Sequence, residues 1–556
     1  MDNLISQLPT ELVEVIVGNL GLSDLRNLRL ACRDVNAKVT VGRRFESFCV
    51  HKNVELRKAS LNDLEARLRS PGVHQYLRHL TVTGVLLITK GLERIIREKT
   101  KPVNPEDPCG LAHDSIGNQS NYRRTPASDS EVADAESQLA HLETQIRIED
   151  AERSAGHDLE ALADLLRTVK THCKLAALES LTLDLVVRRD LTTSLSPALG
   201  APLRQVWEAA QHVLCVSIQA WHRSDIMIER LHIFSETESC GVQAYAFAAL
   251  QSQIDFRIFG GLKALTLSIS DRLLPPSVRA QSRMADRDEE RPILTREQRL
   301  RMRAERDQRE NDLQAQTALE EARARTMMKD PDNINGLSVL LRHTTNLEEL
   351  HVHHYRSLFS PETFDPSLFG TRALLENLAH SAPLPNLRRL SFLNVDVDVS
   401  SLLMMLKNSP RLTSLELRLV KIAVHGGRSM RTLFDYITSR GANLTHVYLD
   451  NIFEASEQGH LYITCFTPGT TPGYSITNDE ERSARLERLG LLGNNGWDLF
   501  RPSANGWNEF ELLRREHVLR GIDYQLNSRY PVGSVQNSQT MEQVRRHMGP
   551  VDLYPY

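Results

Sequence analysis

Residues 386–420 read NLRRLSFLNVDVDVSSLLMMLKNSPRLTSLELRLV, and one spacing of apolar residues occurs twice in them. An apolar residue is followed by a second three positions later and by a third two positions after that, at Leu387-Leu390-Phe392 and at Leu412-Leu415-Leu417. Side chains two residues apart point to the same face of a strand, so each copy predicts a short strand with one apolar face. Residues 401–406 (SLLMML), between the copies, are typical of a helix. The order strand, helix, strand implies parallel strands joined by a right-handed crossover.

The spacing occurs nine times along the chain. The other copies are Leu77-Leu80-Val82, Leu178-Leu181-Leu183, Ile228-Leu231-Ile233, Leu262-Leu265-Leu267, Leu347-Leu350-Val352, Leu444-Val447-Leu449 and Leu486-Leu489-Leu491. One such strand cannot bury its own face, so the series predicts strands stacked side by side in a solenoid. Chance would account for one leucine triplet, but not for nine with helical stretches between them. The pattern resembles irregular leucine-rich repeats, although the Asn or Cys of the strict repeat is mostly missing. The fold class expected is therefore α/β.

Two polar stretches interrupt the series. Residues 101–155 are rich in Pro, Ser and Asn, which predicts a largely disordered insert at least as far as Val132. In the second stretch, 271–332, 25 of the 54 residues from Ser277 to Asp330 are charged, which predicts a solvated helix or a disordered insert. A partner-binding arm is the functional alternative for this charged insert. Removing residues 271–330 shortens the separation of Leu262 and Leu347 from 85 to 25 residues, so the insert is an excursion from a continuous solenoid.

The N-terminal residues predict three short helices. Residues 8–20 read LPTELVEVIVGNL, in which Pro9 occupies the first helical position, where its missing N–H costs nothing. One apolar face is formed by Leu12, Val15, Ile16 and Leu20. A second helix over residues 24–31 and a third, short helix complete a unit of about 45 residues, near the lower limit for independent folding. We therefore expect its apolar groups to be shared with a partner or with the following domain.

This segment resembles an F-box. The family pattern is matched at Leu8-Pro9, Glu11-Leu12, Ile16, Leu20, Asp24-Leu25, Leu28-Arg29 and Cys32-Arg33, and it departs at Val35, where many members carry Trp. The resemblance implies binding to a Skp-type adaptor and, through it, to a cullin. The adaptor-binding residues it implies are Leu8, Pro9, Glu11, Leu12, Ile16, Leu20, Leu25, Leu28, Cys32 and Val35. An ordinary amphipathic helical hairpin is the alternative.

The F-box and the repeats together resemble the architecture of a non-catalytic substrate receptor of a Skp–cullin–F-box ubiquitin ligase. The alternatives are an F-box scaffold without a ligase role and, more remotely, a hydrolase. The expected division is an F-box over 1–49, a first repeat and linker over 50–100, the polar insert over 101–155, solenoid over 156–270, the charged insert over 271–332, solenoid over 333–495, and a C-terminal cap and tail over 496–556.

Residues between the apolar positions of each strand point away from the core and are expected to line the concave face, where a target protein would bind. The substrate-binding residues predicted are Arg230, His232, His351, His353, Arg389, Glu416, Arg418, His446, Tyr448 and Asp450, with Phe234, Glu349, Ser391, Leu393 and Ser414 on the same face. The mixed charges favour a folded protein or peptide over nucleic acid. Trp497 and Trp507, before a helix expected over residues 508–520, suggest a hydrophobic cap or, alternatively, a substrate pocket.

Composition excludes several functions. Lys+Arg number 67 against 71 Asp+Glu, which argues against binding nucleic acid by bulk charge. Seven scattered cysteines without a C-x-x-C spacing predict neither a zinc ribbon nor a dithiol, and a reduced intracellular protein is expected. His351 and His353 share a strand face but lack a nearby third ligand, so no metal is expected. No nucleotide-binding or hydrolase motif is present. We expect no cofactor, no membrane span and no secretory leader, in the cytoplasm or nucleus.

Overall fold

The structure is a computed structural model of residues 1–556. The residues it describes are 8–41, 50–69, 76–102, 124–189, 194–195, 203–235, 237, 240–270, 331–355, 371–425, 429–450, 452–455, 461–466, 509–512, 522 and 524–527. Residues 271–330, the ninth repeat at residues 486–491, and both Trp497 and Trp507 lie outside this set.

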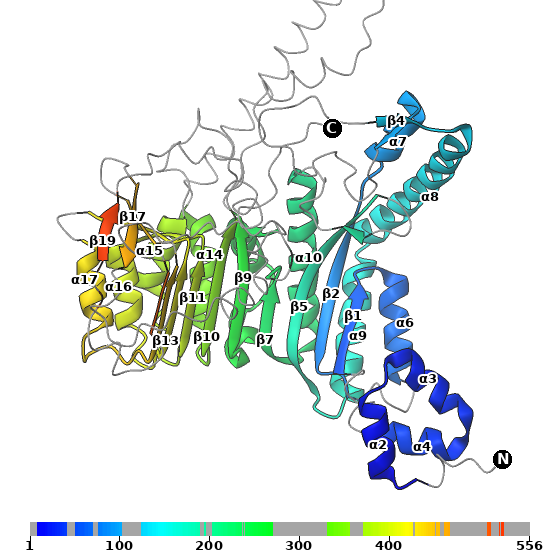
Figure 1. Ribbon diagram of the computed structural model, residues 1–556, viewed down its shortest axis with the longest axis horizontal. Coiled ribbons are helices and arrows are strands. Elements are labelled where there is room, and N and C mark those ends of the chain that lie inside the picture. Colours follow the sequence, from blue (N-terminus) through cyan, green and yellow to red (C-terminus); the bar gives the residue numbers. More distant parts are fainter. Residues whose placement is uncertain are drawn as a thin grey trace, which may run out of the picture.

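A long parallel sheet forms the centre of the molecule (Figure 1). Its parallel strands, in spatial order, are β1 (His51–Glu55), β2 (His79–Leu87), β5 (Ala177–Arg188), β7 (Met227–Ile233), β9 (Ala264–Ser270), β10 (Glu349–Tyr355), β11 (Arg389–Leu393), β13 (Ser414–Arg418) and β15 (His446–Asp450). The first eight copies of the apolar spacing coincide with the strands from β2 to β15. The prediction of an α/β fold with stacked parallel strands is therefore confirmed, and β1 is a strand that the spacing did not reveal.

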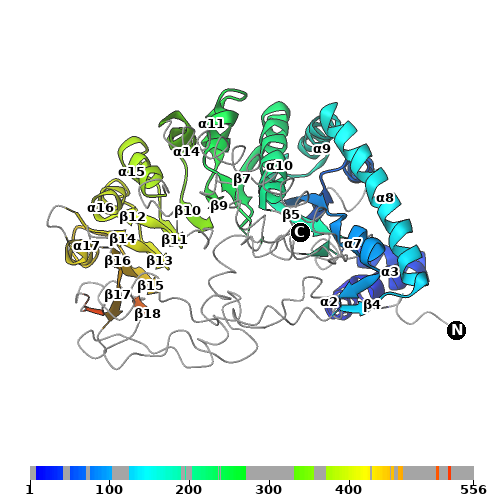
Figure 2. The same cartoon turned by 90° about the horizontal axis from the view of Figure 1, so that it is seen from above.

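The described helices that pack on this sheet all cover the same face of it. They are α6 (Lys58–Arg69), α9 (His157–His172), α10 (Leu203–Ser224), α11 (Tyr245–Gln251), the 3₁₀ helix η3 (Phe256–Gly261), α14 (Pro331–His343), α15 (Thr371–Ser381), α16 (Val399–Lys407) and α17 (Met430–Ile437). Viewed from above, they form an outer arc and the strands an inner one (Figure 2). The sheet is thus curved, with its concave face on the side away from the helices.

The core lies between the sheet and the helices. Equivalent apolar residues of neighbouring strands pair in register, so they form a continuous row across the sheet. Each member is at most 1% exposed: Leu80, Leu181, Leu231, Leu265, Leu350, Leu390, Leu415 and Val447. Each repeat closes its neighbour's apolar face, which is why no single repeat would be stable alone. Truncating one such leucine to alanine would cost about 2–5 kcal/mol.

A second, smaller sheet follows the last three parallel strands. It joins β12 (Asp396–Asp398), β14 (Lys421–Ala423) and β16 (Phe453–Ala455) in parallel to β17 (Leu461–Phe466) and β19 (Tyr524–Asn527), which are antiparallel. The chain enters this sheet through left-handed residues, Asn394 (φ 57°) and Leu419 (φ 52°). Their N–H groups donate to Arg418 O and Asp450 O of the adjacent repeats, both at 2.8 Å. The turn is therefore held by the next repeat and not by its own residues.

The helix expected over residues 508–520 is wrong at its start. Residues Glu509–Leu512 form strand β18, which pairs antiparallel with β15. The edge of β15 presents unpaired backbone N–H and C=O groups, and pairing with them outweighs local helix preference. Two further short strands, β6 (Ser194–Leu195) and β8 (Val242–Gln243), pair with β5 and β9.

An arm projects from the N-terminal end of the sheet, beside β1 and β2 (Figure 1). It comprises α7 (Lys90–Glu98), the hairpin strands β3 (Thr100–Pro102) and β4 (Arg124–Pro126), and α8 (Asp129–Ser154). The prediction that residues 101–155 are largely disordered is wrong for residues 124–155. Ser128 and Glu131 form a capping box that starts the 26-residue helix α8. Leu142 then packs with Leu92 of α7 in a small separate core.

The N-terminal residues form three helices, as predicted: α2 (Thr10–Gly18), α3 (Leu22–Ala31) and α4 (Arg33–Val41). They make a small core of their own, separate from the core of the large sheet. In Figure 1 they lie beyond the β1 end of the sheet, below α6.

Candidate interaction surfaces

Helix α2 has an inward and an outward apolar face. Val13 and Val17 are 0% and 1% exposed and pack in the core of the N-terminal helices. Leu12, Val15 and Ile16 point outward and are 51%, 66% and 41% exposed. We call these three residues the α2 strip. Three large aliphatic side chains exposed within two turns of one helix are typical of a surface that a partner covers.

The ten residues assigned to adaptor binding separate into exposed and internal ones. Pro9, Glu11, Leu12 and Ile16 are exposed. Leu25 and Val35 are each 0% exposed, so the expectation that they contact an adaptor directly is wrong; they hold the helices together instead. The four half-buried residues, Leu8, Leu20, Leu28 and Cys32, pack against the same core. Of the predicted apolar face, Leu20 packs against this core, whereas Leu12, Val15 and Ile16 remain exposed. Val13 and Val17, which the predicted face did not include, are buried instead.

Polar contacts fix the angle at which α2 is held. Lys38 Nζ of α4 donates to Leu8 O at 2.7 Å, which ties the start of α2 to the third helix. Arg29 Nε of α3 donates to Asn36 Oδ1 of α4, also at 2.7 Å. These contacts connect all three helices, so the α2 strip is presented on a braced unit.

The concave face of the sheet carries rows of polar side chains in register. One row runs across the strands as Asn53, Thr81, Thr182, His232, Thr266, His351, Ser391, Glu416 and Tyr448. A parallel row is His51, His79, Ser180, Arg230, Ala264, Glu349, Arg389, Ser414 and His446. The pairing thus brings together, on one surface, residues that are up to 395 positions apart in the chain (His51 and His446).

Most residues predicted to bind substrate lie on this face, exposed or half-buried. They are Arg230, His232, His351, His353, Arg389, Glu416, Arg418 and His446, together with Glu349, Ser391, Leu393 and Ser414. Three expectations are wrong. Phe234 is 0% exposed because the chain turns left-handed there (φ 51°) and takes the ring into the core. Tyr448 and Asp450 are 1% and 5% exposed, at the end of the sheet where β18 adds to β15.

Charges on the concave face interact across neighbouring strands. Glu349 Oε1 lies 3.8 Å from Arg389 Nη1, and Glu349 Oε2 lies 3.9 Å from His351 Nε2. Arg418 pairs with Glu416, and its guanidinium lies 5.0 Å from the centre of the Tyr448 ring. The β13–β15 end is thus internally compensated, while the β7–β11 part has more positive than negative groups.

Burial lowers the pKa of His351. The positive charges of Arg389 and Arg418 and the neighbouring His232 act in the same direction, and Glu349 opposes them. His79, at the other end of the sheet, also has a lowered pKa, because of burial first and His51 second. The rings of His51 and His79 stack with centroids 4.2 Å apart. His351 and His79 therefore favour the neutral imidazole at pH 7.

A further set of residues that sequence reasoning missed lies at the beginning of the strands or just before them. Ion pairs connect neighbouring repeats there: Arg78 with Glu179 at 3.0 Å, Lys263 with Glu229 at 2.8 Å, and Arg388 with Glu348 at 3.6 Å. Their partners are 101, 34 and 40 residues apart. Only knowledge of the repeat register could have paired them, and they serve to align repeats.

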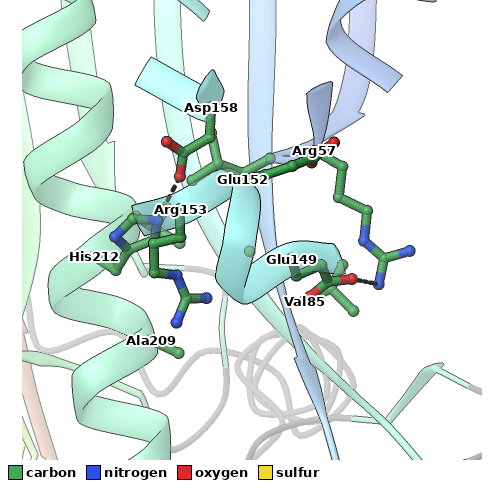
Figure 3. Close-up of a pocket in the computed structure, with 11 residues that line it drawn as sticks. Arg57, Val85, Glu149, Glu152, Arg153, Asp158, Ala209 and His212 are labelled. Atoms are coloured by element: carbon green, nitrogen blue, oxygen red, sulfur yellow. Dashed lines mark hydrogen bonds and ion pairs between the residues drawn. The ribbon is translucent and has the colours of Figure 1, made fainter. Parts of the chain in front are cut away.

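A small pocket lies where α8, α9 and α10 meet the end of β2 (Figure 3). Arg57 Nη2 lies 2.6 Å from Glu149 Oε1, and His212 Nε2 lies 2.7 Å from Asp158 Oδ2. Burial raises the pKa of Glu149 against the opposing charge of Arg57. Burial would also raise the pKa of Asp158, but the hydrogen bond and charge of His212 outweigh it and lower that pKa.

The side chains around this pocket connect the arm to the sheet. Its cavity volume of about 30 Å³ has room for about two water molecules. That is too little for a substrate, and the 11 residues lining it include no serine, threonine or cysteine that could act as a nucleophile. Arg57 joins the loop after β1 to Glu149 of α8, so the pair fastens the arm to the sheet.

Over the residues that the structure describes, no group of three or more His, Cys, Asp or Glu side chains is placed to hold a metal ion. In the same parts of the chain, no helix combines the length and apolar character needed to cross a bilayer. No protein-family model matches the sequence, and no curated protein matches it significantly.

Proposed function

We propose that this protein is a non-catalytic substrate receptor of a Skp–cullin–F-box ubiquitin ligase. In this proposal α2, α3 and α4 are an F-box that binds the Skp-type adaptor. The curved sheet is a leucine-rich-repeat solenoid, and its concave face binds the target protein. The receptor supplies no reacting group; it holds the target near the conjugating enzyme, so the rate enhancement comes from proximity.

The α2 strip is the observation that carries the proposal. Leu12, Val15 and Ile16 are exposed on a helix of nine residues, while Val13 and Val17 of the same helix are buried. Three large aliphatic side chains that stay in water contribute no burial free energy to this small helical unit. A partner that covers them recovers that free energy, and the resemblance of this segment to the F-box pattern supports a Skp-type adaptor as the partner.

The placement of the two surfaces supports simultaneous binding. The N-terminal helices lie beyond the β1 end of the sheet, and the concave face extends away from them toward β15 (Figures 1 and 2). A target on β7–β11 would be separated from the β1 end of the sheet by β2 and β5, and neighbouring strands are about 4.8 Å apart. An adaptor and a target would therefore not compete for the same residues.

The proposal is tested by Ile16→Asp in the full chain, with capture by a purified Skp-type adaptor as the measurement. Ile16 is 41% exposed, so the substitution should leave the helices folded, but it would bury an unpaired charge in the complex. We expect adaptor affinity to fall by at least about 100-fold, which corresponds to about 2.7 kcal/mol.

The matched control is Ile148→Asp. Ile148 is 47% exposed, on α8 of the arm, and the substitution adds the same charge at similar exposure. Adaptor capture should be unchanged by Ile148→Asp. If Ile16→Asp binds the adaptor as well as the unmodified chain does, the assignment of α2 is wrong. If the adaptor is captured but a cullin never joins the complex, the chain is an F-box scaffold and not a ligase subunit.

A further inference from the structure

The β7–β11 part of the concave face carries more Arg and His side chains than acidic ones. It carries the side chains of Arg230, His232, Thr266, Glu349, His351, His353, Arg389 and Ser391, which we call the central patch. Two arginines against one glutamate leave it with one net positive charge when the imidazoles are neutral. Protonation of its three histidines would add three more.

The side chains of β9 place no acid beside Arg230. Three residues of β9 lie on the concave side of the strand: Thr266 is half-buried, and Ala264 and Ser268 are 5% and 0% exposed. None of them carries a charge, and β9 lies between Arg230 of β7 and the acid Glu349 of β10. Arg230 is exposed, and among the described residues it has no carboxylate within ion-pairing distance. Within the described part of the chain, a negative group of a ligand can therefore approach Arg230 without displacing a carboxylate.

Arg389 differs from Arg230 in having a weak internal partner. Its guanidinium lies 3.8 Å from Glu349, and the Arg389 side chain is 63% exposed. An exposed pair at this distance contributes little, about 0–1 kcal/mol. A ligand carboxylate that forms two parallel hydrogen bonds to Arg389 would therefore replace Glu349 as its partner.

We propose that the central patch binds an acidic segment of the target in extended conformation, which crosses the strands from β7 to β11. This inference rests on the proposed function and specifies the class of target segment. Arg230 and Arg389 occupy the same row three strands apart, roughly 14 Å at about 4.8 Å per strand. An extended chain covers that distance in about four residues. The recognised segment thus carries acidic side chains at positions i and i+4. Ala264 and Glu349 lie in the row between the two arginines, and His351 lies in the neighbouring row.

The probes are two fluorescent twelve-residue peptides built from Ser and Gly with three Glu. In one the Glu residues are spaced four apart, and in the other they are contiguous. Binding to the full chain is measured by fluorescence anisotropy at low ionic strength, because exposed charges are screened at high salt. We expect the spaced peptide to bind at least about threefold more tightly than the contiguous one.

Three substitutions are expected to change the affinity for the spaced peptide in different ways. Arg230→Ala should weaken binding of the spaced peptide by about fivefold, which corresponds to an exposed charge-assisted contact. Glu349→Gln should strengthen it by about twofold, because the substitution removes the negative charge of the patch. Arg388→Ala is the matched control: Arg388 is 60% exposed and adjacent to Arg389 but pairs with Glu348 before the strand. Its loss should leave binding unchanged.

Several outcomes would overturn the inference. Equal losses for Arg388→Ala and Arg230→Ala would show attraction to overall charge and no defined patch. Tighter binding of a single-stranded oligonucleotide than of the spaced peptide would assign the patch to nucleic acid. If neither peptide binds while the same preparation captures the adaptor, the patch assignment fails and the proposed function stands. If the spaced peptide binds with the predicted pattern but the adaptor does not, the function fails and the patch stands.

Discussion

At the scale of single residues, two histidines of the concave face, His351 and His79, link the stability of the sheet to pH. His351 sits in a row that is continuous over the whole sheet, and burial lowers its pKa. His79 has the same shift for the same first cause. A lowered pKa means that folding favours the neutral imidazole, so these positions tie the stability of the sheet to pH.

Stability should therefore fall in weak acid. The unfolded chain takes up protons at these histidines near pH 6.5, and the folded chain takes them up at a lower pH. Below about pH 6.5 the unfolded state holds more protons, so the free energy of unfolding decreases until the pH passes the folded pKa. We expect His351→Gln to show a smaller decrease in Tm between pH 7.5 and 5.5 than the unmodified chain. Identical decreases would mean that His351 does not titrate differently on folding.

At the scale of elements, the close packing of helix α14 on helix α11 depends on one glycine. Gly336 of α14 faces α11, and a Cβ at this position would collide with the backbone of Phe247 and Ala248. Backbone atoms cannot move aside as the end of a side chain can, so α11 and α14 pack closely only because position 336 lacks a side chain.

Gly336→Ala should therefore lower the free energy of unfolding by about 2 kcal/mol or more. Gly91→Ala is the control, since Gly91 also lies in a helix, α7, and has no atom within 4 Å of where a Cβ would stand. Alanine is a better helix former than glycine, so this change should be neutral or stabilising by up to about 1 kcal/mol. Urea unfolding of both variants measures the difference. Equal stability of the two would contradict the close packing of α11 on α14.

At the scale of the whole molecule, the repeat architecture should tolerate loss of the charged insert. Each repeat contacts its neighbours, so stability is distributed along the sheet and does not depend on one loop. Strand β9 ends at Ser270 and α14 begins at Pro331, on either side of the stretch with 25 charged residues between Ser277 and Asp330.

Deletion of residues 277–326 should shift Tm by only a few degrees. It would reduce the separation of Leu262 and Leu347 from 85 to 35 residues, within the range of the other repeats. The entropy of closing a loop changes slowly with its length, and little apolar surface is removed. Differential scanning calorimetry of the deleted chain checks this. Loss of soluble protein would show that the insert contributes to the core.

Much of the large parallel sheet could be predicted from the sequence because its pattern is local and repeated. The Leu390 and Leu415 positions, for example, identify strands β11 and β13 through spacing alone, since a strand buries every second side chain. Strand β1 escaped notice because only Val54 of its five residues is buried, which leaves no repeated spacing to find. Helix α8 escaped notice because it packs on α7 through a few apolar residues separated by charged ones.

By itself the sequence determined the α/β class, the order of the strands from β2 to β15 and the presence of an apolar face on the first helix. Only the tertiary structure decided which aliphatic residues of that helix are covered, since Val13 and Ile16 are both aliphatic and differ in what packs against them. It also decided that Tyr448 and Asp450 are buried while Arg230 and His351 remain on the concave face. Periodicity is a property of neighbours along the chain, whereas burial at the edges of a sheet and the meeting of charges depend on residues brought together from distant positions.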